Sequence, residues 1–160
     1  MLPVSLMLPV SPRRFQPTEA SREPTEASRE RKDPCRPPSI VSVSPEEWRA
    51  ILTVRPNLLI EGPNATTEVI LRALGSHCAL PVVWWSDGLP RGNAATLIVR
   101  DVAALSMDDQ ERLLRWLDTP GPRIQVISTT PRPLFPQVQR GLFLENLYYR
   151  LNVVMVEAVD

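Results

Sequence analysis

The sequence has few of the residues that build disulfide frameworks and metal sites. It contains two cysteines, Cys35 and Cys78, and a single histidine. Two cysteines are too few for a disulfide framework, and no Cys or His spacing resembles a zinc site. We therefore predict no metal site, free thiols and a cytoplasmic location.

Long apolar runs are also missing. None approaches the roughly 20 residues that cross a bilayer, so we predict no membrane span. The apolar start, Met1–Ser11, has no basic region before it and is interrupted by Pro3 and Pro9, which argues against a secretory signal. Neither sign of charge is in excess, because 18 basic residues balance 18 acidic ones. Net charge therefore gives no case for nucleic-acid binding.

Proline is abundant: there are 18 prolines and only 6 glycines, and many prolines lie in the first quarter of the chain. Two short tandem duplications also lie there, Met-Leu-Pro-Val-Ser (residues 1–5 and 7–11) and Pro-Thr-Glu-Ala-Ser-Arg-Glu (17–23 and 24–30). The units are too short and too polar to bury a core. We predict a disordered leader over residues 1–43; a linear recognition motif or a start codon assigned too far upstream are alternatives.

Residues 44–160 alternate between strand and helix patterns, which predicts one α/β domain with a parallel sheet covered on both faces, a three-layer sandwich of about five strands. The predicted strands are 57–62, 81–86, 96–99, 123–129 and 153–156, and the predicted helices begin near residues 44, 64, 106, 134 and 142.

Local signals place the helix starts. Ser44, followed by Pro45 and two acids, is typical of a cap, and Ser106 with Asp109 three residues later suggests a second. For the helix after Gly62, Asn64 or Thr66 is the predicted cap.

Three segments resemble one family. Gly141–Val154 reads Gly-Leu-Phe-Leu-Glu-Asn-Leu-Tyr-Tyr-Arg-Leu-Asn-Val-Val, close to G-x-F-R-x-D-L-Y-Y-R-L-N-V-V. Thr96–Leu117 is similar to T-L-F-L-D-E-I-x-x-L-s-x-x-x-Q-x-x-L-L-R-x-L, and Arg123–Leu134 to R-x-I-x-A-T-N-x-x-L. From about Leu58 to Val154 the chain resembles the AAA+ domain of the sigma-54-dependent transcriptional activators, which implies a P-loop-NTPase-like fold.

The resemblance implies a nucleotide pocket at the turn from Glu61 to Glu68, yet this turn departs from a P-loop. P-loop glycines let backbone N–H groups approach the phosphates, and a lysine neutralises the phosphate oxygens. Here only Gly62 is retained, Pro63 removes a donor, no lysine is present, and Glu68 adds negative charge. Thr66 and Thr67 could still bind an anion.

The implied magnesium site is altered as well. The family's Asp-Glu pair holds Mg²⁺ and activates water, but it aligns with Arg100 and Asp101, or with Asp101 and Val102 after a one-residue shift. Either alignment loses a required carboxylate. The sensor Asn aligns with Pro131, and of two arginines in the last helix only Arg150 is retained, as a vestigial arginine finger or a surface ion-pair residue.

Two parts of the family pattern are short or missing. Arg91–Ala94 stands where the family has a long insertion that contacts the sigma factor. The chain ends at Asp160, so we expect neither the helical lid nor a DNA-binding domain.

These residues predict a non-catalytic module that acts through protein contacts in transcription regulation, without a cofactor. Its predicted partners are AAA+ activators or the RNA polymerase sigma factor, and the oligomeric state stays open. Gly62, Thr66, Thr67 and Asp101 would form a vestigial nucleotide pocket. A weak ATPase that binds ATP and Mg²⁺, and a decayed gene product, are the alternatives. His77–Cys78 and Trp84–Trp85 are interpreted as packing residues.

Overall fold

The structure is a computed structural model that describes residues 36–90, 95–119 and 123–159. The tandem duplications of the leader and the short Arg91–Ala94 connection lie outside the described residues.

A five-stranded parallel sheet forms the centre of the domain. In chain order its strands are β1 (Leu58–Glu61), β2 (Val82–Trp84), β3 (Thr96–Val99), β4 (Gln125–Thr130) and β5 (Val154–Glu157). They lie side by side in the order β2-β3-β4-β1-β5, and every neighbouring pair is parallel. The predicted α/β class and strand number are confirmed.

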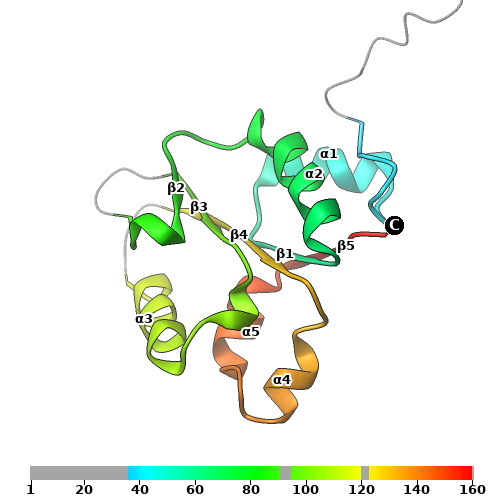
Figure 1. Ribbon diagram of the computed structural model, residues 1–160. Coiled ribbons are helices and arrows are strands. Elements are labelled where there is room, and N and C mark those ends of the chain that lie inside the picture. Colours follow the sequence, from blue (N-terminus) through cyan, green and yellow to red (C-terminus); the bar gives the residue numbers. More distant parts are fainter. Residues whose placement is uncertain (1–35, 91–94, 120–122, 160) are drawn as a thin grey trace, which may run out of the picture. The chain divides into compact units, whose positions relative to one another are not determined.

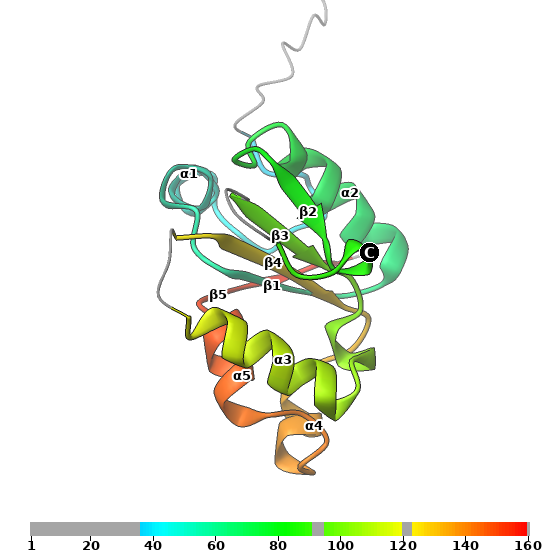
Figure 2. The same cartoon turned by 90° about the vertical axis from the view of Figure 1, so that its left-hand side faces the viewer.

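Helices cover both faces of the sheet, which confirms the three-layer arrangement. Figure 2 shows α1 (Pro45–Val54) and α2 (Asn64–Gly75) on one face, and α3 (Met107–Leu117), α4 (Phe135–Gln139) and α5 (Glu145–Leu151) on the other. Two short 3-10 helices, η1 (Trp85–Asp87) and η2 (Val102–Ala104), follow β2 and β3. Among the described residues, no helix has the length and apolar character that a bilayer crossing requires.

Each face has its own hydrophobic core, which explains the continuous apolar runs of the strands. Ile60, Ile98 and Ile127 pack toward α1 and α2, whereas Leu59, Leu97 and Val126 pack toward α3 and α5. Since neighbouring residues of a strand face opposite sides, strands buried on both faces need apolar residues at every position. Trp84 and Trp85 likewise pack against different cores.

The helix starts agree with prediction at two of three sites. The Ser44 hydroxyl accepts the Glu47 N–H while the Glu47 carboxylate accepts the Ser44 N–H, a complete capping box. Ser106 caps α3 by accepting the Asp109 N–H. The predicted cap of α2 is wrong, because the helix already begins at Asn64 and Pro63, which precedes it, provides no side-chain cap.

Two other element boundaries also differ from prediction. The second strand is shorter than predicted, because the chain turns into η1 at Trp85. The last helix begins at Glu145 rather than at Leu142. Residues 141–144, which include Gly141 with φ +70° and the buried Phe143, form a turn and bends before α5.

Residues 40–42 pair with the extension of the edge strand β5. Val41 forms an antiparallel bridge with Ala158, the Ser42 N–H donates to the Glu157 carbonyl, and the Val159 N–H donates to the Ile40 carbonyl. Val41 is buried against the core under α1. These residues were assigned to the leader from the sequence, and in the structure they pack with the domain.

Candidate functional site

The carboxyl ends of parallel strands are where α/β proteins place their ligands. In Figure 1 this edge lies where β1 leads into α2 and β3 leads into η2. Gly62 and Asp101 both lie there, one on each side of β4. The Gly62 N–H donates to the Thr130 carbonyl at 3.0 Å, and the Asp101 N–H donates to the Thr129 hydroxyl at 3.2 Å. The structure therefore brings these two predicted site residues to one edge.

Gly62 is required by close packing. Its φ is +147°, and a Cβ at this position would lie 2.6 Å from the Ala158 Cβ and 2.7 Å from the Ala158 carbonyl oxygen. The Ala158 N–H in turn donates to the Glu61 carbonyl at 2.7 Å. The glycine thus lets β1 and the extension of β5 approach each other. This packing explains a glycine at position 62 without a bound phosphate.

The backbone donors of Thr66 and Thr67 are already used. Both N–H groups donate to the Pro63 carbonyl, at 3.0 and 2.9 Å, as part of the first turn of α2. The Thr67 hydroxyl donates to the Asn64 carbonyl at 3.1 Å, and the side chain of Thr67 is buried. A P-loop needs such N–H groups to point at the phosphates. Here α2 begins at Asn64, so the N–H groups of Thr66 and Thr67 form hydrogen bonds within the first turn of the helix and do not point at a phosphate.

Lysine is also missing from this edge. The only lysine in the sequence is Lys32, which lies outside the described residues. The described part of the domain therefore has no ammonium group to take the place of the P-loop lysine.

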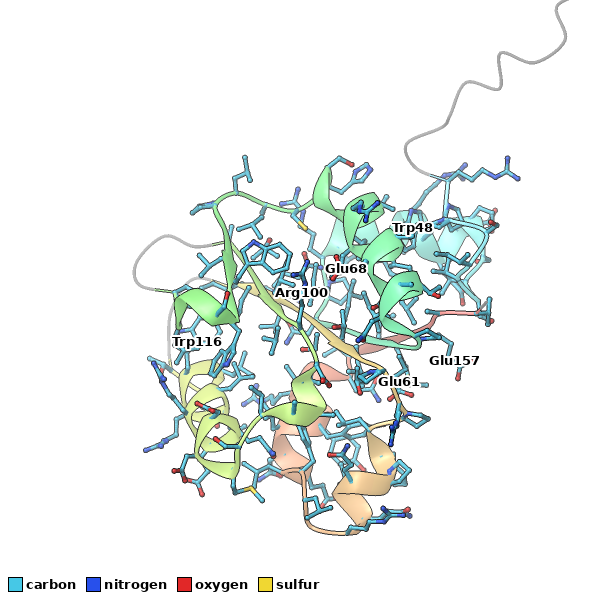
Figure 3. All side chains as sticks on the ribbon, in the orientation of Figure 1. Trp48, Glu61, Glu68, Arg100, Trp116 and Glu157 are labelled. Carbon is cyan, nitrogen blue, oxygen red and sulfur yellow. The ribbon has the colours of Figure 1, made fainter. Side chains whose placement is uncertain are left out.

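Arg100 and Glu68 form an ion pair at this edge of the sheet. Arg100, the first residue after β3, contacts the Glu68 carboxylate with two nitrogens: Nη2 lies 2.9 Å from Oε2, and Nε lies 2.9 Å from Oε1. The guanidinium carbon lies 4.4 Å from the centre of the Trp84 ring. Figure 3 shows Glu68 and Arg100 pointing toward each other from α2 and β3. Glu68 was predicted to add negative charge at this turn, and in the structure Arg100 pairs with its carboxylate.

Asp101 starts η2 in a left-handed conformation with φ +45°. The next residue, Val102, is fully buried in the core under α3. A valine side chain in that position has no proton-accepting group. Asp101 is therefore the one acidic side chain that directly follows β3.

Two further carboxylates lie at this edge. Glu61 ends β1 and stands beside Glu157 in the register of β5. The Glu61 carboxylate accepts the Leu134 N–H at 3.0 Å. Burial raises the pKa of Glu61 above its ordinary value, the Leu134 hydrogen bond opposes this, and the charge of Glu157 adds to it. Because triphosphates are anions, Glu61 and Glu157 make this edge less favourable for them.

Arg150 lies away from this group. It is in the last turn of α5, which leads into the start of β5, so it lies at the amino edge of the sheet. Its guanidinium pairs with Asp118, just after α3, and both side chains are about half exposed. Within one chain Arg150 therefore does not join Gly62 and Asp101.

His77 and Cys78 also lie near the amino edge, beside a small cavity of about 10 Å³ between α1, α2 and β4. Burial raises the pKa of the Cys78 thiol, and the nearby Arg55 opposes this. A thiol with a raised pKa is a poor nucleophile at neutral pH. Among the described residues, no three His, Cys, Asp or Glu side chains gather as metal ligands.

Sequence reasoning missed several structural contacts. The Glu68–Arg100 pair had no sequence signal, since the two residues are 32 positions apart. The side-chain amides of Gln110 and Asn57 accept backbone N–H groups of Leu144 and Val126, and the sequence did not predict these contacts. A signal existed for Gln110, because its position matches the Gln of the family pattern.

Comparisons with known proteins agree with this geometry at the level of the fold. NtrX from Brucella abortus in complex with ATP superposes with a TM-score of 0.56 at 22% identity, covering 69% of this chain and 34% of that one. Another NtrX structure from the same organism gives 0.53 at 24% identity, covering 71% and 36%.

Two curated relatives are transcription regulators. The DNA-binding transcriptional regulator NtrC of Rhizobium meliloti (strain 1021) is 36% identical over 75 residues, 40% of this chain and 16% of that protein. The HTH-type transcriptional regulatory protein TyrR of Salmonella typhimurium is 33% identical over 75 residues, 40% and 15%. The chain thus spans about one sixth of the length of these relatives.

A family model described as the sigma-54 interaction domain matches residues 65–159, more than half of the chain. The matched range covers β2 to β5 and the Gly141–Val154 segment. Together with the five-stranded parallel sheet, this match shows that the chain belongs to the sigma-54 interaction domain family of AAA+ proteins.

Proposed function

We propose that this chain is a non-catalytic member of its family that acts in transcription regulation through protein contacts. The observation that carries the proposal is the Glu68–Arg100 ion pair, because one of the two alignments with the family puts Arg100 where a metal-binding carboxylate is expected. An arginine at that position would repel Mg²⁺, and its pairing with Glu68 occupies that carboxylate. Asp101 is then the one carboxylate directly after β3, where the family has two.

The turn after β1 supports the same proposal. It carries no lysine, and the Thr66 and Thr67 N–H groups donate to Pro63. The phosphates of ATP would therefore meet neither the cation nor the backbone donors that hold them in a P-loop. Glu61 and Glu157 add negative charge nearby.

Nucleotide titration tests the non-catalytic part. A fluorescent ATP analogue with Mg²⁺ should show no saturable binding to the full chain up to millimolar concentration. The positive control is NtrX from Brucella abortus, which has been crystallised in complex with ATP, under identical conditions. Saturable binding to this chain at micromolar concentration, or ATP hydrolysis above the buffer rate, would overturn the proposal.

The surface proposed for partner contact is the Gly141–Arg150 segment. Tyr149 is 59% exposed and Leu142 is 59% exposed on this segment. Tyr149 also makes an edge contact with the buried Tyr148, with ring centres 5.3 Å apart. Large aromatic side chains held in place by neighbours are frequent anchors of protein interfaces.

Purified candidate partners test this surface. An AAA+ activator and the sigma-54 factor, each titrated with the full chain, should give at least one saturable complex. A Tyr149→Ala variant should weaken it about tenfold or more if Tyr149 is an anchor. Met107→Ala, which removes another exposed apolar side chain outside this segment, is the control. Failure of both partners to bind would remove the support for this part of the proposal.

A further inference from the structure

The guanidinium of Arg100 is held by two side chains from different elements. Glu68 of α2 contacts Nε and Nη2, both at 2.9 Å, in the two-pronged arrangement that suits a carboxylate. Trp84 of β2 packs against the guanidinium, with its ring centre 4.4 Å from the guanidinium carbon. The contacts fix the position and orientation of the cation.

This cation lies at the edge of the sheet where ligands of α/β proteins bind. It directly follows β3, next to Asp101, whose N–H bonds to Thr129 of β4. The Arg100 side chain is 55% exposed and the Glu68 side chain is 35% exposed, so solvent ions reach both. An arginine fork binds a phosphate group with the same two donors that it uses for a carboxylate.

Glu68 and a phosphate would therefore compete for the same nitrogens. Glu68 has the advantage that it is tethered to α2 and is always present beside Arg100. Its charge also repels an approaching anion. We propose that Glu68 is an internal competitor that keeps an anion-binding site on Arg100 closed. This inference rests on the proposed function, because a chain that already bound ATP at this edge would have no closed site.

The alternative is that the pair only ties α2 to β3. Removing Glu68 would then lower stability slightly, as exposed ion pairs contribute little, and it would create no affinity for anions. The two explanations differ in what a variant without the carboxylate binds.

Binding of inorganic tripolyphosphate without Mg²⁺ separates them. The full chain, Glu68→Gln and Glu68→Ala are titrated by calorimetry at low ionic strength. Both variants should bind tripolyphosphate at least about tenfold more tightly than the wild type, because the carboxylate that occupies the two Arg100 nitrogens and repels the anion is removed. The Gln side-chain oxygen could still accept a hydrogen bond from Arg100 and so compete with the anion. The alanine variant removes this competition.

Two controls assign the effect to Arg100. Glu111→Gln removes the same charge from an exposed site on α3 and should leave tripolyphosphate affinity at the wild-type level. Glu68→Gln combined with Arg100→Gln should lose the gain. Equal affinity of wild type and both Glu68 variants, or an equal gain in Glu111→Gln, would overturn the inference while leaving the ATP–Mg²⁺ test of the proposed function unaffected.

Discussion

The side-chain oxygen of Gln110 accepts the backbone N–H of Leu144 at 2.8 Å. The side-chain nitrogen of Gln110 donates to the carbonyls of Leu142, at 3.2 Å, and Leu105, at 3.0 Å. Gln110 is 1% exposed. One buried amide on α3 therefore holds the segment before α5 and the residue that follows η2, and so positions the Gly141–Arg150 surface.

Replacing Gln110 should destabilise the domain strongly. Gln110→Ala leaves the Leu144 N–H and the carbonyls of Leu142 and Leu105 without their partner in a partly buried setting. We expect the free energy of unfolding to fall by about 2–4 kcal/mol. Urea unfolding followed by circular dichroism measures it. Gln139→Ala, on the exposed side of α4, is the control and should change the free energy by less than about 0.5 kcal/mol. Similar losses in both variants would contradict this role of Gln110.

Gly62→Ala should also be destabilising. The new Cβ would lie 2.6 Å from the Ala158 Cβ and 2.7 Å from its carbonyl oxygen, at a φ of +147°. We expect a loss of about 2–3 kcal/mol in the free energy of unfolding.

Gly75 provides the matched control for that substitution. It ends α2, its φ is not in the positive range, and a Cβ there would meet nothing within 4 Å. Gly75→Ala should therefore leave the domain unchanged or stabilise it by up to about 1 kcal/mol. If Gly62→Ala were as well tolerated as Gly75→Ala, the close approach of β1 to Ala158 would not be a constraint on the fold.

The fold followed from the sequence because its signals are local and repeated. Apolar runs such as Leu58–Ile60 and Thr96–Val99 are long enough to mark strands buried on both faces. Ser44 and Ser106 mark helix starts with contacts that reach three residues along the chain. The predicted start of α2 near residue 64 agrees with the structure, but its predicted cap was wrong, because Pro63 precedes the helix and provides no side-chain cap.

The contacts within the candidate site were harder to predict, since they join residues far apart in the chain. Only the family resemblance aligns Arg100 with a carboxylate. Its pairing with Glu68 depends on the packing of α2 over β3. The constraint on Gly62 arises from Ala158, almost a hundred positions later. Patterns within a short stretch of sequence do not predict contacts between residues that lie far apart in the chain.

The stability of the domain should depend on the ionisation of Glu61. Its pKa is raised in the folded state by burial and by Glu157. The folded state therefore binds the proton more readily than the unfolded state, and this group stabilises the fold at low pH and ceases to do so as pH rises through its folded-state pKa.

Glu61→Gln should remove this dependence. The Gln side-chain oxygen can still accept the Leu134 N–H, and it carries no charge to be desolvated or repelled. We expect the variant to be more stable than wild type at neutral pH, with a difference that disappears below the ordinary pKa of 4.5. Thermal unfolding of both proteins at a series of pH values measures the difference. Glu111→Gln is the control, and a Glu61→Gln difference that grows as pH falls would have the wrong sign.

At the opposite edge of the sheet, Asn57 should matter more for stability than Arg150. The Asn57 amide donates to the Arg150 carbonyl at 2.9 Å and accepts the Val126 N–H at 2.9 Å, so it joins α5 to β4 beside the start of β1. Asn57→Ala should lower the free energy of unfolding by about 1–3 kcal/mol, because the partly buried Val126 N–H loses its acceptor and the Arg150 carbonyl loses its donor.

Arg150→Ala separates that backbone contact from the arginine side chain. The variant keeps the carbonyl that Asn57 contacts and removes only the exposed ion pair with Asp118. Its free energy of unfolding should change by less than about 1 kcal/mol. Urea unfolding of the two variants side by side measures both values. A larger loss in Arg150→Ala than in Asn57→Ala would show that the ion pair, rather than the amide of Asn57, holds the end of α5 against the sheet.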